Sequence, residues 1–250
     1  MNEMLKLLSA VLPGVLLLAY ILWTDRKNPE PWQLIVKGIV CGFISSGIMG
    51  LFWKYLPDYF TWAGMQDTII EKVRCAFLYA AIPEEMAKLI MLWVVMSRNT
   101  FYNEPRDGIV YAVCVGLGFA TLENISYISG YENWGAVALA RAMLSVPAHY
   151  LCAVLMGYYY ANARFWPTKG VRRFWQLVRI ILLPVLMHGT FDSLASVIHW
   201  NTTALYVLAF FFLILVGWIH HHCNQLSDKQ SLDDFRSVVS GTQGEDNVIL

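Results

Sequence analysis

The chain has 250 residues, of which 57% are hydrophobic and 14% charged, and its 18 basic and 18 acidic residues cancel to a formal net charge of +0. A mean hydropathy of +0.48 is too high for a water-soluble domain, whose surface must be largely polar. The balanced charge gives no indication of a nucleic-acid partner. We therefore expect an integral membrane protein in contact with a lipid bilayer.

Apolar runs long enough to cross a bilayer recur along the chain. A hydrocarbon core of about 30 Å needs about 20 apolar residues in a helix. Such runs occupy 5–23, 34–53, 74–96, 108–128, 136–160, 175–198 and 204–220. The sequence thus predicts an all-α polytopic membrane helix bundle of about seven transmembrane helices. Residues 1–222 form one membrane-embedded domain in this interpretation, and the polar residues 223–250 form a flexible cytoplasmic tail.

Basic residues mark alternate connections between these runs, at Arg26 and Lys27, at Arg98 and Arg106, and at Arg164, Lys169, Arg172 and Arg173. Connections rich in Lys and Arg tend to stay in the cytoplasm. The pattern predicts an N-terminus outside and a C-terminus in the cytoplasm. In the second run, Gly38, Gly42, Gly47 and Gly50 offer small surfaces for close helix contacts.

Ionisable residues interrupt four of the apolar runs. The third run holds Glu84, Glu85 and Lys88, the fourth holds Glu123 with Asn124, the fifth holds Arg141 with His149, and the sixth holds His188 with Asp192. Each costs roughly 2.5–3.5 kcal/mol at the centre of a membrane helix. Because that cost is too large to leave unpaired on several helices, we expect these groups to face one another or water.

Helical spacing supports this grouping, because residues four apart share one face. Glu84 stacks with Lys88 and His188 stacks with Asp192, which places Asp192 where it can fix one tautomer of the histidine. Pro83 removes a backbone donor just before the glutamates and predicts a kink or a loosened turn there. A single buried pair would be as readily structural as functional, but contributions from four helices favour a functional site.

Two carboxylates and two imidazoles suit peptide hydrolysis. One glutamate accepts a proton from water, and a histidine stabilises the oxyanion or protonates the leaving amine. We favour this metal-free water activation with no cofactor, and Glu85 as the general base. Zinc is the alternative, held by Glu85, Glu123, His149 and His188, although no HExxH spacing occurs. A proton-coupled transporter or a partner-binding membrane protein is the other alternative, although no inverted repeat is visible.

Six short segments give the sequence a resemblance to a known family. They are Asp25 with Glu30-Pro31, IPEEMAK at 82–88, DGIVYA at 107–112, GLGFATLENISY at 116–127, VPAH at 146–149 and HGTFD at 188–192. In this order they resemble the PrsW-type intramembrane proteases, relatives of the CAAX prenyl endopeptidases and the bacteriocin-immunity membrane proteases. Lys88 comes one position earlier, and Glu123 replaces a histidine, relative to the wider group.

The resemblance implies a protease in a bacterial cytoplasmic membrane that makes a regulatory first cut in a membrane-anchored substrate such as an anti-sigma factor. It implies a catalytic set of Glu84, Glu85, Glu123, His149 and His188, supported by Lys88, Asn124, Arg141 and Asp192. The wider group has been described both as metal-dependent and as glutamate-type. The sequence sets no oligomeric state and no substrate identity.

Overall fold

The computed structural model describes residues 2–55, 68–198, 210–211, 214–215 and 217–218, and all regular structure in this part of the chain is helical. The elements in chain order are α1 (Asn2–Thr24), α2 (Trp32–Tyr55), α4 (Ile69–Arg74), the π-helix η1 (Cys75–Ala81), α5 (Ile82–Met96), α6 (Pro105–Gly130), α7 (Trp134–Ala140), the π-helix η2 (Arg141–Ser145), α8 (Val146–Phe165) and α9 (Gly170–Ile198). The predicted all-α class is confirmed.

Five helical stretches in the described residues are long and apolar enough to cross a membrane: Glu3–Thr24, Trp32–Tyr55, Pro105–Gly130, Trp134–Phe165 and Gly170–Ser196. The predicted count of about seven is therefore not confirmed. The predicted run 74–96 is helical, but it carries Glu84, Glu85 and Lys88, which lower its apolarity. The run 204–220 lies largely outside the described residues, and the predicted tail 223–250 lies wholly outside them.

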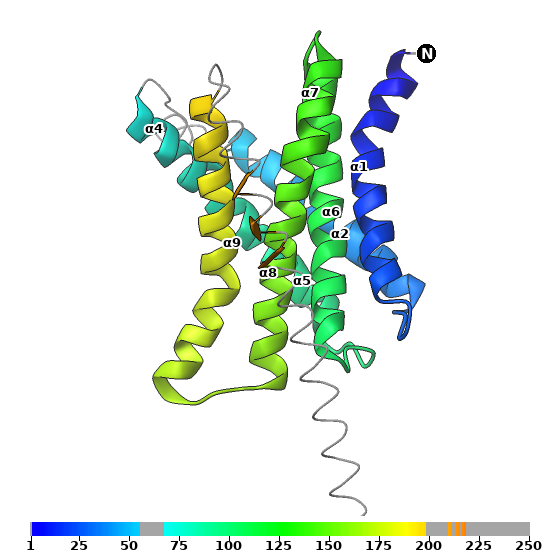
Figure 1. The fold of residues 1–250 in the computed structure, drawn as a ribbon, viewed down its shortest axis with the longest axis vertical. Coiled ribbons are helices and arrows are strands. Elements are labelled where there is room, and N and C mark those ends of the chain that lie inside the picture. Colours follow the sequence, from blue (N-terminus) through cyan, green and yellow to red (C-terminus); the bar gives the residue numbers. More distant parts are fainter. Residues whose placement is uncertain (1, 56–67, 199–209, 212–213, 216, 219–250) are drawn as a thin grey trace, which may run out of the picture.

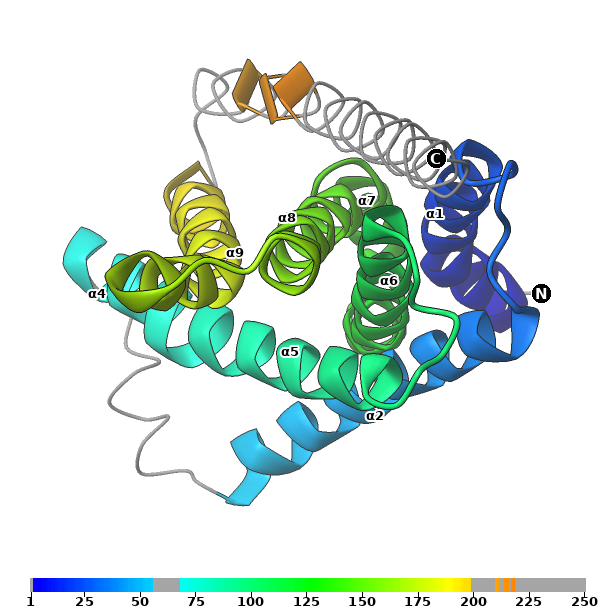
Figure 2. The same ribbon diagram turned by 90° about the horizontal axis from the view of Figure 1, so that it is seen from below.

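Helix α6 forms the centre of the bundle. It packs against α8 on one side and against α2 and α1 on others, while α8 also packs against α9. Figure 2 shows α6 and α8 enclosed between α1, α2, α5 and α9. Because α6 has neighbours around it, its residues from Asp107 to Ala120 are buried. Helix α1 instead exposes large apolar side chains such as Leu12 and Leu16, as expected for a surface in contact with lipid.

Glycines bring α2 and α6 into close contact. A Cβ atom added at Gly42 would overlap the carbonyl oxygen of Val115 and lie 2.8 Å from the Cα atom of Gly118. A Cβ atom added at Gly38 would meet the Cβ atom of Cys114 at 2.7 Å. The predicted role of small residues holds for these two positions. Added Cβ atoms at Gly47 and Gly50 meet nothing within 4 Å among the described residues.

Both π-helices end just before a proline. In η1 the N–H of Ile82 bonds to the carbonyl of Phe77, and in η2 the N–H of Val146 bonds to the carbonyl of Arg141, five residues back in each case. Pro83 and Pro147 have no N–H to continue the α-helical ladder. The carbonyl of Tyr79, four residues before Pro83, accepts the indole N–H of Trp53 at 3.3 Å. The loosened turn predicted at Pro83 is therefore present.

The connections 25–31, 97–104 and 166–169 lie at the same end of the bundle, at the bottom of Figure 1. Side chains join the first two connections, since Asn28 Nδ2 donates to Glu104 Oε1 at 2.7 Å and Arg106 Nε lies 3.4 Å from Asp25 Oδ1. Burial raises the pKa of Asp25 to about 7, with Arg106 opposing the shift. Burial also raises the pKa of Glu30, which accepts a hydrogen bond from the Tyr111 hydroxyl.

Candidate active site

Four helices bring the ionisable residues of the sequence analysis into one buried group. Glu84, Glu85 and Lys88 lie in the first two turns of α5, directly after Pro83. Helices α6, α8 and α9 contribute Glu123, His149 and His188, respectively. The exposed fractions are 2% for Glu84, 0% for Glu85, 3% for Lys88, 3% for His149 and 4% for His188. Such burial is tolerable only because the groups neutralise one another.

Lys88 lies at the centre of this group. Its Nζ atom is 2.7 Å from Glu85 Oε1, 3.6 Å from Glu84 Oε2 and 3.0 Å from His149 Nδ1. The same ammonium lies 4.0 Å from the centre of the Phe119 ring on α6, in a cation–π contact. One cation thus ties α5 to α6 and α8 and offsets one of the two negative charges of the adjacent glutamates.

The contacts of His149 define its tautomer. An ammonium has only donors, so His149 Nδ1 accepts from Lys88 and carries no proton. Its Nε2 atom then donates to Glu123 Oε2, at 2.8 Å. Arg141 also holds this glutamate, with Nη2 at 2.6 Å from the same oxygen, while its Nε donates to Asn124 Oδ1 at 2.6 Å. Glu123 and Asn124 therefore position the imidazole and the guanidinium together.

His188 has carboxylates on both sides of its ring. Nδ1 lies 2.8 Å from Glu85 Oε1, and Nε2 lies 3.3 Å from Asp192 Oδ2 and 3.9 Å from Glu84 Oε2. The predicted pairing of His188 with Asp192 is therefore present. Glu85 makes the shorter contact, on the opposite nitrogen. The Asp192 side chain is 30% exposed, so the group reaches the protein surface on that side.

Two carboxylate oxygens in this group, Glu84 Oε2 and Glu85 Oε2, have no hydrogen-bond partner in the part of the chain that the structure describes. Glu84 Oε2 lies 3.9 Å from His188 Nε2, which also contacts Asp192, so this carboxylate oxygen can accept a hydrogen bond from water or bind a cation. Residues Glu84, His149 and His188 each offer a ligand atom within 4.8 Å of the others, and so do Glu85, Cys152 and His188. Carboxylate, imidazole and thiolate are all zinc ligands, so the chemistry of these donors fits the metal.

The fit has a condition, because both ring nitrogens of His149 and both of His188 already have partners. A metal would displace Lys88 or Glu123 from the His149 imidazole, and Glu85 or Asp192 from that of His188. Neither group matches the four residues considered for zinc in the sequence analysis, which include Glu123 and not Glu84 or Cys152. Each of these ligand sets stays a prediction.

The structure thus brings all the predicted residues together, with Lys88 among the five acids and imidazoles and with Asn124, Arg141 and Asp192 beside them. It adds two residues that the sequence analysis did not select for the site. Phe119 lies one helical turn before Glu123 and covers Lys88. Cys152 lies close to Glu85 and His188, and its thiol donates to the carbonyl of Pro184 at 3.7 Å. Of these two residues, only Phe119 could have been found from spacing, because it lies four residues before Glu123 and therefore shares its helix face.

Comparisons with known proteins give a consistent result. The profile of a family described as PrsW family intramembrane metalloprotease matches residues 30–218. A relative named Protease PrsW from Geobacillus kaustophilus (strain HTA426) is 36% identical over 76% of this chain and 80% of its own length. Relatives of the same name in Clostridioides difficile (strain 630) and Bacillus subtilis (strain 168) are 33% and 31% identical, over 76% and 86% of this chain and 79% and 92% of their own lengths. No solved structure matches the chain significantly.

Proposed function

The chain belongs to the PrsW family of intramembrane metalloproteases, and we propose that it hydrolyses a peptide bond of a membrane-anchored protein. The family and the apolar helices make it an integral membrane protease, which disfavours the transporter alternative. One observation supports the proposed site above others: within the described residues, Glu84 Oε2 accepts no hydrogen bond and lies 3.9 Å from His188 Nε2 inside a buried group of charged side chains.

In the mechanism that we propose, a water molecule lies between Glu84 and His188. Glu84 accepts a proton from the water while the water oxygen bonds to the scissile carbonyl carbon. The positive charge of Lys88 and the imidazoles stabilise the oxyanion of the tetrahedral intermediate. When the C–N bond breaks, Glu84 returns the proton to the leaving amine. A zinc ion bound by Glu84, His149 and His188 would polarise the carbonyl and acidify the water.

The geometry leads us to prefer Glu84 over Glu85 as the general base. Glu85 Oε1 already contacts both Lys88 and His188 Nδ1. We propose that Glu85 positions these two side chains, as a carboxylate behind a histidine commonly does. The earlier choice of Glu85 as the base is the competing assignment, and one experiment separates the two.

The test is cleavage of single-span membrane proteins by the purified full-length protein in lipid. Loss of a general base lowers the rate about 10²- to 10⁴-fold. Glu84→Gln should show such a loss in kcat, and His188→Ala a comparable one. Glu132→Gln, an exposed acid in the 131–133 connection, is the matched control and should cut like the wild type. Full activity of Glu84→Gln together with inactivity of Glu85→Gln would overturn our assignment of the base.

A chelator arm addresses the metal. The assignment of Glu84 as the base belongs to the metal-free mechanism, because a zinc ion held by Glu84 would occupy that carboxylate. We favour metal-free water activation, as in the sequence analysis. Cleavage that survives a strong chelator supports that preference. Cleavage that disappears on chelation and returns with zinc makes this chain a zinc protease. In that case Cys152→Ser discriminates the donor sets, since only the set with Glu85 includes the thiol.

Three finer proposals rest on the family resemblance and on charge. The substrate is an anti-sigma-factor-like protein that receives a regulatory first cut. The protein resides in a bacterial cytoplasmic membrane as one membrane-embedded unit of residues 1–222, followed by a cytoplasmic tail. Its N-terminus lies outside, because the basic connections share one end of the bundle (Figure 1). Tag accessibility of the 131–133 connection from the cytoplasm would overturn this orientation.

A further inference from the structure

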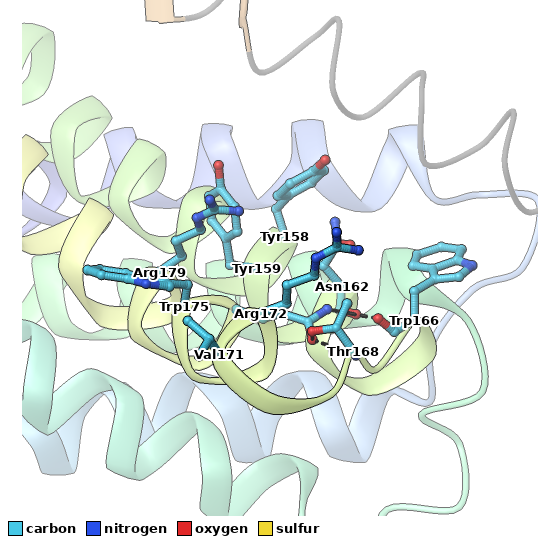
Figure 3. Close-up of a pocket in the computed structure, with 10 residues that line it drawn as sticks. Tyr158, Tyr159, Asn162, Trp166, Thr168, Val171, Arg172, Trp175 and Arg179 are labelled. Atoms are coloured by element: carbon cyan, nitrogen blue, oxygen red, sulfur yellow. Dashed lines mark hydrogen bonds between the residues drawn. The ribbon is translucent and has the colours of Figure 1, made fainter.

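A second cavity lies away from the candidate active site, between the end of α8 and the start of α9 (Figure 3). Its volume is about 660 Å³, within the range of about 300–1,000 Å³ that small-molecule sites occupy. The side chains of Arg172 and Arg179 line it together with tyrosine and tryptophan rings (Figure 3). Neither arginine has a role in the proposed proteolytic mechanism.

The cavity walls are the facing stripes of two helices. On α9 the lining residues Arg172, Trp175, Gln176 and Arg179 recur at intervals of three and four, so they share one face. On α8 the lining residues Tyr158 and Asn162 lie four apart, and Trp166 follows four residues later, directly after the helix ends. Both helices thus turn a polar and aromatic face toward the same space.

Gln176 makes this part of the structure rigid. Its Nε2 atom donates to the carbonyls of Asn162 at 2.9 Å and Trp166 at 2.8 Å. Its Oε1 atom accepts from the backbone N–H of Thr168 at 3.1 Å and from Arg173 Nη1 at 3.2 Å. One side chain therefore joins the end of α8, the connection and the start of α9. The cavity does not depend on the position of a free loop.

The cavity carries positive charge that no acidic side chain among the described residues neutralises. From residue 141 to residue 191 the sequence has six basic residues and no Asp or Glu. No acidic residue lines the cavity, and Arg172 and Arg179 have no ion pair or side-chain hydrogen bond in the described part of the chain. Two guanidinium groups over an aromatic wall are suited to bind a phosphate group.

Its location points to a membrane source for that phosphate. The first turns of α9 also expose the apolar side chains of Val171, Phe174 and Leu177. Arginines interleaved with exposed apolar and aromatic residues at a helix end are typical of the boundary between lipid tails and headgroups. We propose that this cavity binds the phosphate headgroup of an anionic phospholipid through Arg172 and Arg179, independently of the proteolytic function.

The experiment is a lipid titration of the full-length protein in neutral detergent. Short-chain phosphatidylglycerol, short-chain phosphatidylcholine and inorganic phosphate are each added, and the apparent Kd is read from the rise in Tm. We expect saturable protection by phosphatidylglycerol that exceeds protection by the other two. Arg172→Gln and Arg179→Gln should each raise its Kd about tenfold, since each removes a charge-assisted contact with the phosphate. Arg172→Lys, which keeps the charge without the planar fork, should lie between wild type and Arg172→Gln.

Lys169→Gln is the matched control, because it removes one positive charge just before α9, near Arg172, at a residue that does not line the cavity. We expect its Kd to change less than twofold. Equal weakening by Lys169→Gln and Arg172→Gln would mean a general surface-charge effect and would overturn the site. Equal protection by phosphatidylcholine, or by inorganic phosphate alone, would overturn the anionic lipid as its ligand. Unliganded Tm values that match the wild type exclude misfolding as the cause of any loss.

Discussion

Replacement of Gly42 by alanine tests the close contact between α2 and α6. The added Cβ atom would lie 2.8 Å from both the Cα atom of Gly118 and the backbone N of Phe119, and closer still to the Val115 carbonyl oxygen. Ordinary contacts begin near 3.4 Å, so the helices must separate locally by about 0.6 Å or more. Because the obstructing atoms belong to the backbone, no side-chain rotation relieves the overlap. Overpacking of this kind costs about 1–3 kcal/mol.

For a chain of this size, each kcal/mol corresponds to about 2–4 °C in Tm, so we expect Gly42→Ala to melt about 2–12 °C below the wild type. The assay is thermal unfolding of the purified protein in one detergent. Gly47→Ala on the same helix is the control, since its Cβ atom meets nothing within 4 Å among the described residues. Its Tm should equal or exceed that of the wild type, because alanine favours the helix. Equal Tm values for the two variants would refute the close packing of α2 on α6.

Two further predictions concern charged groups. Asp25→Asn should stabilise the protein, and the gain should grow as the pH rises from about 4 to about 7 and then level off. Burial raises the pKa of Asp25 from 3.8 to about 7 against the opposing effect of Arg106, so in this range the folded wild type holds a proton that the unfolded chain has lost. A Tm gain over wild type that is no larger at pH 8 than at pH 5 would contradict this, and Glu132→Gln controls for loss of an exposed acid. Arg141→Met should cost about 3–5 kcal/mol, because it leaves the Glu123 carboxylate, 12% exposed, without its 2.6 Å partner. The cost should shrink in a Glu123→Gln background, and equal Tm losses in both backgrounds would exclude the pairing.

The membrane class and the convergence of the ionisable residues could be predicted from sequence, because burial cost leaves such groups few alternatives. Local pairs such as Lys88 with Glu84 followed from helical spacing. The partners of Glu123 did not, because Arg141 and His149 reach it from another helix and spacing carries no information on that contact. The preference between Glu84 and Glu85 likewise needed the structure, since adjacent residues face different neighbours. The count of about seven spans was not confirmed, in part because three ionisable residues reduce the apolarity of the run 74–96.

The π-helices η1 and η2 also bear on how chain length varies within such a protein. A π turn accommodates one residue more than an α turn, and one residue corresponds to about 100° of helix rotation. Removal of a single residue from 75–81 or 141–145 would return that segment to a regular α-helix. Because the π turn already absorbs the extra residue, Glu84 or His149 would keep its direction relative to the upstream half of its helix, whereas the same deletion in a regular α-helical stretch would turn it by about 100°. The two π segments are therefore places where the chain can lose one residue without rotating the site.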